Sequence, residues 1–549
     1  MSFTAALHTL GSFVSELPAS QLCLGAAVLG LISHHAYFIH GERDAHVWTY
    51  FLVLLGTPSM LAALLYLSTA AGLSHTVSTV TLATTSFLSA MAASIFVYRL
   101  YFHPLSRFPG PSPTRLSKLY YIHAYTQARG QYFRVQQRWH AQYGDIVRSG
   151  PNELIVLRPE LLPVLGKAAK GSWYNNGNRN SSIQLVKDRE THSVRRRVWD
   201  KAFTPDAVKA YAPRVKHYTD MLLEKLAEGE REKDITAWFS YYTFDVMGAF
   251  TFGRDFGMLE KGGRDGSDYF LRMTHASMRS IALLGHTPWL LLLMEMLGAA
   301  GKEHMKFLEW CKERVDDRKR RGMGEMGSDL FEVLLEAEPK NIGPHHVPLR
   351  GDSRTAIVAG SDTTAATLIA LFTYLGSSPE TLSKLQAELD SLPADSTESP
   401  YLSACINEAL RLNTAVPSGV SRYIPPEGVT LDDGTFLPGG VNVYFPLWVA
   451  MRDERWFDNP EEFCPERWLI STPEKLAEMK AVFQPFWIGR YQCVGRPLAL
   501  AELHSVGAAV ARRFDISLVG DRDAAFAKTI DTFTLEMGEI RCVFTERLL

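Results

Sequence analysis

Residues 486–495 read FWIGRYQCVG, and this stretch governs how the rest of the chain is interpreted. Cys493 lies between Gly489 and Gly495, and glycine permits the positive φ of a tight turn. Such a turn can aim backbone N–H groups at the sulfur and lower the pKa of the thiol, which suits a metal ligand. The apolar stretch 495–514 predicts a helix whose N-terminus favours a negative sulfur. A lone cysteine is more often a small buried hydrophobe, so this stretch alone leaves both interpretations open.

Three upstream motifs are weak singly. Residues 356–376 read AIVAGSDTTAATLIALFTYLG, an apolar helix interrupted by polar residues that are unfavourable when buried unless they are used or hydrogen-bonded. A threonine hydroxyl there can bond to the preceding turn and open a local bulge. In INEALRL, Glu408 and Arg411 are spaced to pair on one helix face. FCPERW, residues 463–468, places Arg467 in a proline-punctuated loop.

Taken together, in this order and spacing, the four segments resemble the cytochrome P450 family of haem-thiolate monooxygenases. The resemblance covers the chain after about residue 100. It implies a mainly α fold with small β-sheets. Alternating patterns independently predict strands within residues 145–157, 428–445 and 532–544.

The resemblance also implies roles for single residues around haem b. Cys493 becomes the axial ligand of the iron, Phe486 covers the sulfur side, and Gly489 shapes the loop. Asp362 and Thr363 relay protons to bound dioxygen. Gly360 leaves room for that dioxygen, and the scaffold is formed by Glu408, Arg411 and Arg467. By position in the family, substrate is expected to meet residues 173–183, the helix near Ile357, residues 416–420 and Phe533.

Haem propionates need cations, and the resemblance offers several. His192 and Arg196 stand at i, i+4 in THSVRRRVW, on one helical face, and Arg422 follows the E-x-x-R helix. The family usually places a basic residue two before the cysteine, but here Tyr491 occupies that position and Arg490 precedes it. Either the Tyr491 hydroxyl binds a propionate, or Arg490 reaches it through a changed turn. We expect Tyr491 to take the position, with Arg490 helping or facing the electron donor.

The N-terminus is predicted to be a membrane anchor with two to three transmembrane helices. Three apolar stretches cover about residues 22–39, 47–73 and 79–98, and a spanning helix needs about 20 such residues. The second and third stretches qualify, whereas two histidines make the first marginal. Basic residues are absent before the first stretch and follow the third, which places the C-terminal part on the cytosolic side. Helices of a large soluble core are the other interpretation of these stretches.

The expected organisation is therefore an anchor at residues 1–100, a proline-rich hinge at residues 101–113, and a haem-binding catalytic domain at residues 114–549. Hydrophobic residues make up 46% of the 549 residues, which suffices for a large core. A formal net charge of −2 argues against a nucleic-acid partner. Six scattered cysteines without a C-x-x-C pair argue against a zinc site or a disulfide framework.

The resemblance implies a multi-pass protein of the endoplasmic reticulum, with its catalytic domain facing the cytosol. It implies insertion of one oxygen atom from O₂ into an apolar small molecule, with electrons from a separate NADPH-cytochrome reductase. The anchor and hinge look like those of fungal members that act on secondary metabolites such as terpenoids, polyketides or alkaloids. Two alternatives stay open: a non-oxygenating haem-thiolate isomerase or dehydratase, and a haem-binding membrane protein without turnover.

Overall fold

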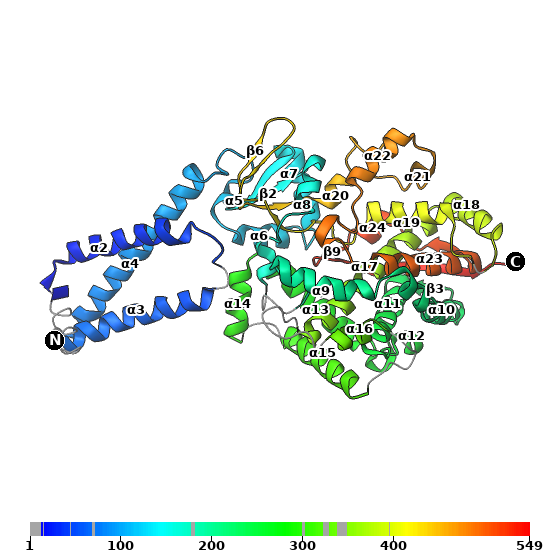
Figure 1. The fold of residues 1–549 in the computed structure, drawn as a ribbon, viewed down its shortest axis with the longest axis horizontal. Coiled ribbons are helices and arrows are strands. Elements are labelled where there is room, and N and C mark those ends of the chain that lie inside the picture. The colour runs from blue at the N-terminus through cyan, green and yellow to red at the C-terminus, as the bar shows by residue number, and fades with distance from the viewer. Residues whose placement is uncertain are drawn as a thin grey trace.

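The chain forms a helical bundle at its N-terminus and a larger helix-rich domain beside it (Figure 1). The structure is a computed structural model. It describes residues 13–14, 16–43, 46–68, 72–176, 182–298, 302–321, 329–337, 348–394 and 396–548.

The N-terminal bundle consists of long apolar helices, drawn in blue in Figure 1. They are α2 (Ala19–Ser33) with η1 (His34–Phe38), α3 (Val47–Ser68), and α4 (Leu73–Val97) with η3 (Tyr98–Phe102). Three segments are long and apolar enough to cross a membrane: Ala19–Phe38, Val47–Leu67 and Leu73–Phe102. The first apolar stretch of the sequence thus belongs to a helix of sufficient length.

Close packing joins α2 to α4. A Cβ added at Gly30 would lie 2.4 Å from the carbonyl oxygen of Phe87, so only glycine allows this approach. His34 lies next to this contact, and its Nδ1 is 2.7 Å from the Oγ of Ser94. His34, one of the two histidines that lower the hydropathy of the first apolar stretch, therefore has a polar partner inside the bundle.

The larger domain is mainly helical, as expected. Its longer helices are α5 (Ser112–Leu116), α6 (Leu119–Gln127), α7 (Tyr132–Tyr143), α9 (Arg189–Lys201), α10 (Pro205–Ala227), α11 (Ile235–Phe252), α13 (Tyr269–Leu284), α14 (Pro288–Met296), α15 (Lys302–Arg321), α16 (Leu330–Ala337), α17 (Leu349–Ser377), α18 (Pro379–Asp390), α19 (Pro400–Leu412), α22 (Pro473–Val482), α23 (Arg496–Arg513) and α24 (Arg522–Phe526). Short α-helical turns are α8 (Leu162–Leu165), α12 (Met258–Lys261), α20 (Leu447–Ala450) and α21 (Arg467–Ile470).

Small sheets complete the domain, and all three stretches with alternating patterns contribute strands to them. The largest has the order β1-β2-β7-β4, in which β2 runs parallel to β7 and the other pairs are antiparallel. Its strands are β1 (Ile146–Gly150), β2 (Glu153–Val156), β7 (Asn442–Tyr444) and β4 (Arg422–Tyr423). The others pair β3 (Glu232–Asp234), β11 (Arg541–Glu546) and β8 (Phe514–Leu518), then β5 (Val429–Thr430) with β6 (Phe436–Leu437), and β9 (Ile530–Asp531) with β10 (Leu535–Glu536).

Helix α17 runs through the centre of the domain and packs along α11, α19 and α23. It is as long and apolar as a membrane span, but most of it is buried inside the protein, so it is a core helix. The GSDTT segment does not break it, because the α-helix continues without interruption from Leu349 to Ser377. The expected bulge is absent from this helix, although the Thr363 hydroxyl does donate to the Ala359 carbonyl at 2.7 Å.

Candidate active site

The loop around Cys493 is a tight turn fixed by backbone bonds. Gly489 has a φ of 71°, and a Cβ there would lie 2.3 Å from the carbonyl oxygen of Gly166. The Cys493 N–H donates to the Phe486 carbonyl at 2.9 Å. Gly495 has an ordinary φ of −78° and caps α23 instead of supplying a second left-handed residue. Gly489 is thus the glycine that the turn requires.

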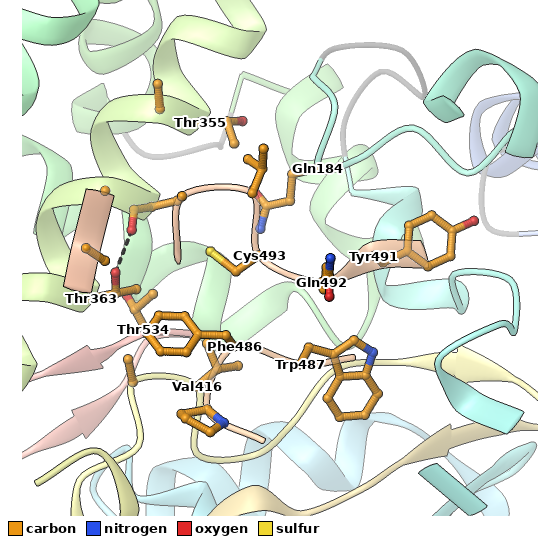
Figure 2. A pocket seen from close by; sticks show the side chains of 18 of the residues that line it. Gln184, Thr355, Thr363, Val416, Phe486, Trp487, Tyr491, Gln492, Cys493 and Thr534 are labelled. Atoms are coloured by element: carbon orange, nitrogen blue, oxygen red, sulfur yellow. Dashed lines mark hydrogen bonds between the residues drawn. The ribbon is translucent and has the colours of Figure 1, made fainter. Parts of the chain in front are cut away.

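The sulfur of Cys493 lies at the N-terminus of α23 and faces an internal cavity (Figure 2). Burial raises the pKa of the thiol, while the backbone N–H groups of Gly495 and Arg496 and the guanidinium of Arg196 act in the opposite direction. These groups would stabilise a thiolate that is bound to a cation.

The cavity holds about 1630 Å³ of space free of protein atoms, with its open mouth included. Figure 2 shows Cys493 near the middle, with Thr363 and Thr534 to one side and Trp487 and Tyr491 to the other. Its apolar wall includes Ile183, Phe203, Met247, Ala356, Ala359, Leu410, Ala415, Val416, Val420, Leu447, Phe486, Val494, Leu498 and Phe533.

Several residues expected to face substrate do line this cavity. They are Tyr174, Ile183, Val416, Val420 and Phe533. Near Ile357, the neighbouring residues Thr355 and Ala356 line the cavity, whereas Ile357 itself is fully buried in the core. Residues 177–181 of the expected segment 173–183 lie outside the described part of the chain.

Basic side chains gather at the end of the cavity near Tyr491. The residues are Lys170, His192, Arg196 and Arg422. The Nζ of Lys170 is 4.9 Å from the centre of the Tyr491 ring, and the Cζ of Arg422 is 5.0 Å from it. Burial, and then the positive charge of Lys170, lowers the pKa of His192 to about 3. With this pKa the His192 side chain is neutral at pH 7, and burial and Arg422 also hold the pKa of Lys170 well below its usual range. The positive charge that favours an anionic ligand at this end therefore comes from Arg196 and Arg422.

Three polar atoms at this end are buried and have no hydrogen-bond partner among the described residues. They are Nδ1 of His192, Nε of Arg422 and Nε1 of Trp487. Buried polar groups are nearly always hydrogen-bonded. A polar ligand at this cavity wall would provide partners for them.

Arg490 and Tyr491 point to different places. Tyr491 lines the cavity, and its ring packs edge-on against His192 with 4.6 Å between ring centres. Arg490 is not among the described residues that line the cavity, and its Nη1 donates to the Ser193 hydroxyl on α9 at 2.8 Å. The loop thus presents a neutral side chain to the cavity where the family pattern has a basic one.

On α17, the side chains of Thr363 and Asp362 also point in different directions. Thr363 lines the cavity, whereas the buried Asp362 points toward α13, with 3.3 Å between its Oδ1 and Nε2 of His275. Gly360 borders the cavity too, but a Cβ there would lie 2.7 Å from the sulfur of Met247, so this glycine also lets α11 pack closely.

The E-x-x-R pair and the P-E-R arginine meet in one buried cluster away from the cavity. Glu408 accepts two bonds from Arg411, at 2.8 and 2.9 Å, and one from Arg467 at 2.9 Å. Trp468 Nε1 and the Cys464 N–H complete its shell. Remaining donors of both arginines reach backbone carbonyls, so this buried charge cluster is well hydrogen-bonded.

Comparison with known proteins gives the family directly. The family model described as "Cytochrome P450" matches residues 110–535. This chain is a cytochrome P450. Among its relatives, "Cytochrome P450 monooxygenase FCK2" of Fusarium pseudograminearum is 37% identical over 95% of this chain and 97% of the relative. "Tryprostatin B 6-hydroxylase" of Aspergillus fumigatus is 32% identical over 89% of this chain and 90% of its own length.

Membership of the P450 family implies a haem iron with a thiolate ligand, and the residues of this P450 fit that group. The Cys493 thiol is inside the protein and opens only onto the cavity, at a helix N-terminus, and the far end of the cavity holds arginines and buried donors that the described residues leave unbonded. This combination suits a flat apolar cofactor that binds through a metal and carries carboxylates.

Sequence reasoning missed two ionisable residues of this P450's cavity, Lys170 and Glu502. Lys170 is almost fully buried and donates to the carbonyls of Ile183 and Gln184 at 3.0 and 2.7 Å. Burial raises the pKa of Glu502 on α23 to about 8. Glu502 lies nine residues after Cys493 on the expected helix, so a helical projection could have placed it; nothing in the local sequence marks Lys170.

Proposed function

We propose that this P450 is a membrane-anchored monooxygenase that inserts one oxygen atom from O₂ into an apolar fungal secondary metabolite. The observation that carries the proposal is the cavity itself, which combines a helix-capped cysteine, an apolar wall and the Thr363 hydroxyl. Relatives that are named as P450 monooxygenases or as a hydroxylase support oxygen insertion as the reaction class.

Haem b supplies the oxygen-activating chemistry when bound, and a thiolate ligand favours O–O cleavage. Cys493 would hold the iron, Phe486 would shield the sulfur, and Gly489 allows the tight turn of the loop around it. His192, Arg196, Arg422 and Tyr491 would bind the propionates, and the two arginines, beside Lys170, would supply the charge that Tyr491 lacks.

Thr363 handles protons at the cavity wall. Its hydroxyl can accept a proton from a partner and donate one in turn. Asp362 stands one residue back on α17 and reaches solvent through His275, whose Nδ1 is 3.7 Å from Oε1 of Glu536. Arg279, on the domain surface, bonds that Glu536 carboxylate. In our proposal His275 and Glu536 pass protons to Asp362, and Arg279 holds Glu536 in place without giving up its own proton.

The anchor is residues 1–100 and the proline-rich hinge is residues 101–113, with the catalytic domain beyond them. We place the protein in the endoplasmic reticulum, multi-pass, with the domain facing the cytosol. We propose that electrons come from a separate NADPH-dependent reductase in the same membrane. An apolar substrate of this kind partitions into lipid and can enter from it.

The test is a metabolite comparison in a fungal host with and without the full-length protein, followed by turnover in isolated membranes. We expect a product that gains one oxygen atom from ¹⁸O₂ and requires both NADPH and reductase. Thr363→Ala should lower product formed per NADPH consumed and raise peroxide release. Turnover without reductase or NADPH would instead show an isomerase or dehydratase.

A further inference from the structure

One carboxylate of the N-terminal bundle is bonded to three segments of the catalytic domain. Glu42 lies in the link between η1 and α3, outside the apolar helices. Both its oxygens lie 2.5 Å from Nζ of Lys187, and it also accepts bonds from Nδ2 of Asn175 at 3.1 Å and from the Tyr423 hydroxyl. Lys187 further donates to Oδ1 of Asn175 at 3.1 Å, which closes the cluster.

Each of these three segments supplies residues that line the cavity. Asn175 follows Tyr174, which lines the cavity. Tyr423 follows Arg422 on β4, and Arg422 Nη1 lies 3.3 Å from the Tyr174 hydroxyl. Lys187 lies three residues after Gln184, whose carbonyl holds Lys170. Glu42 therefore bonds to the back of the same wall that presents Lys170 and Arg422 to the cavity.

The cluster is more than a solvent-exposed ion pair. The side chains of Glu42 and Lys187 are only 27% and 20% exposed. Burial alone raises the pKa of Glu42, but the bonds from Lys187 and Tyr423 outweigh it and leave the pKa below its usual value. Charge-assisted bonds of this kind are stronger than neutral ones. A single carboxylate that joins three segments also restrains their relative positions.

We propose that Glu42 is a positioning residue through which the membrane anchor holds the cationic wall of the cavity in place. The wall consists of residues 170–176, 182–188 and 421–423. The bonding network stands on geometry alone, while the identity of the group that the wall binds rests on the proposed function. The anchor thus restrains the cavity wall through Glu42. Truncating the anchor therefore changes the cavity as well as the location of the protein.

The experiment compares Glu42→Gln with the unchanged full-length protein in lipid nanodiscs by hydrogen–deuterium exchange. Gln keeps the size of the side chain but removes its charge and one acceptor site. Peptides covering the three wall segments should exchange about tenfold faster, because strong bonds to a charged group are lost. Peptides of α17 should be unchanged. Glu42→Asp, which keeps the charge, should restore part of the protection.

Asp220→Asn is the matched control. Asp220 accepts a bond from Lys216 on the exposed face of α10, at 2.6 Å and away from the cavity wall. The Asp220→Asn substitution should leave the hydrogen–deuterium exchange rates of the wall segments unchanged. Haem loss to an excess of apomyoglobin should be several-fold faster in Glu42→Gln and unchanged in Asp220→Asn.

Two results would overturn the proposal: exchange of the wall that does not respond to Glu42→Gln, or acceleration that spreads equally into α17. The exchange readout needs neither haem nor turnover. A loosened wall in a protein that binds no haem would thus refute the proposed function and leave the role of Glu42 standing.

Discussion

At the residue scale, the position two before Cys493 holds a neutral residue where the family pattern has a basic one, and other elements supply the positive charge. Tyr491 places a neutral ring on the cavity wall, and Arg490 turns to Ser193 on α9. Lys170 and Arg422 stand within about 5 Å of the Tyr491 ring, and Arg422 brings positive charge there from a distant part of the sequence. The site keeps its cationic end, but the charge comes from other elements.

This arrangement predicts opposite outcomes for two neighbouring substitutions. Tyr491→Phe should speed haem dissociation about tenfold, since it would remove the hydrogen bond that we propose between this hydroxyl and a charged propionate. Arg490→Ala should change the rate by no more than about twofold. The measurement is transfer of haem to apomyoglobin. Fast haem loss from Arg490→Ala, with Tyr491→Phe like the unchanged protein, would mean that the two roles are reversed.

Sequence could identify some of these residues and not others, for a physical reason. Cys493 and Phe486 belong to one short loop whose spacing is set by a single turn, so the sequence carries their geometry. Lys170 becomes a cavity residue only because its segment bridges to Arg422, 252 positions further along the chain. Nor does spacing reveal that Asp362 faces His275, because neighbours on a helix point in different directions.

At the scale of elements, the Glu408 cluster ties α19 to the segment that precedes the cysteine loop. Helix α19 supplies Glu408 and Arg411, and α21 supplies Arg467 and Trp468. The spacing of E-x-x-R predicted a pair on one face, and the structure has this pair fully buried. The additional bonds to backbone carbonyls depend on how the chain folds back, which a motif does not specify.

Breaking this cluster should destabilise the fold with little direct effect on the cavity. Glu408→Gln leaves two buried guanidinium groups without their counter-charge, and we expect the free energy of unfolding to fall by about 3–5 kcal/mol. Urea denaturation followed by far-UV circular dichroism measures this. Glu309→Gln, which removes an exposed partner of Lys312 on α15, is the matched control and should be indistinguishable from the unchanged protein. Equal stability of both variants would contradict a scaffold role for Glu408.

At the scale of the whole molecule, the N-terminal bundle and the domain contact each other at several places, which include bonds between Arg99 and both Leu116 and Arg148. Glu42 reaches the cavity wall, and α14 packs against α3. Hydropathy predicted the apolar helices but could not predict these contacts, since they depend on where the hinge places the domain. The contact at Glu42 favours a topology in which the link between the first two apolar helices lies on the domain's side of the membrane.

The central claim is that Cys493 ligates a haem iron as a thiolate, and the carbon-monoxide difference spectrum of the reduced full-length protein tests it most directly. We predict the thiolate-type band for the unchanged protein and for Cys464→Ser, which alters another cysteine that is not fully buried. Cys493→Ser should lack that band. Absence of the band from the unchanged protein, or its persistence in Cys493→Ser, would contradict the account.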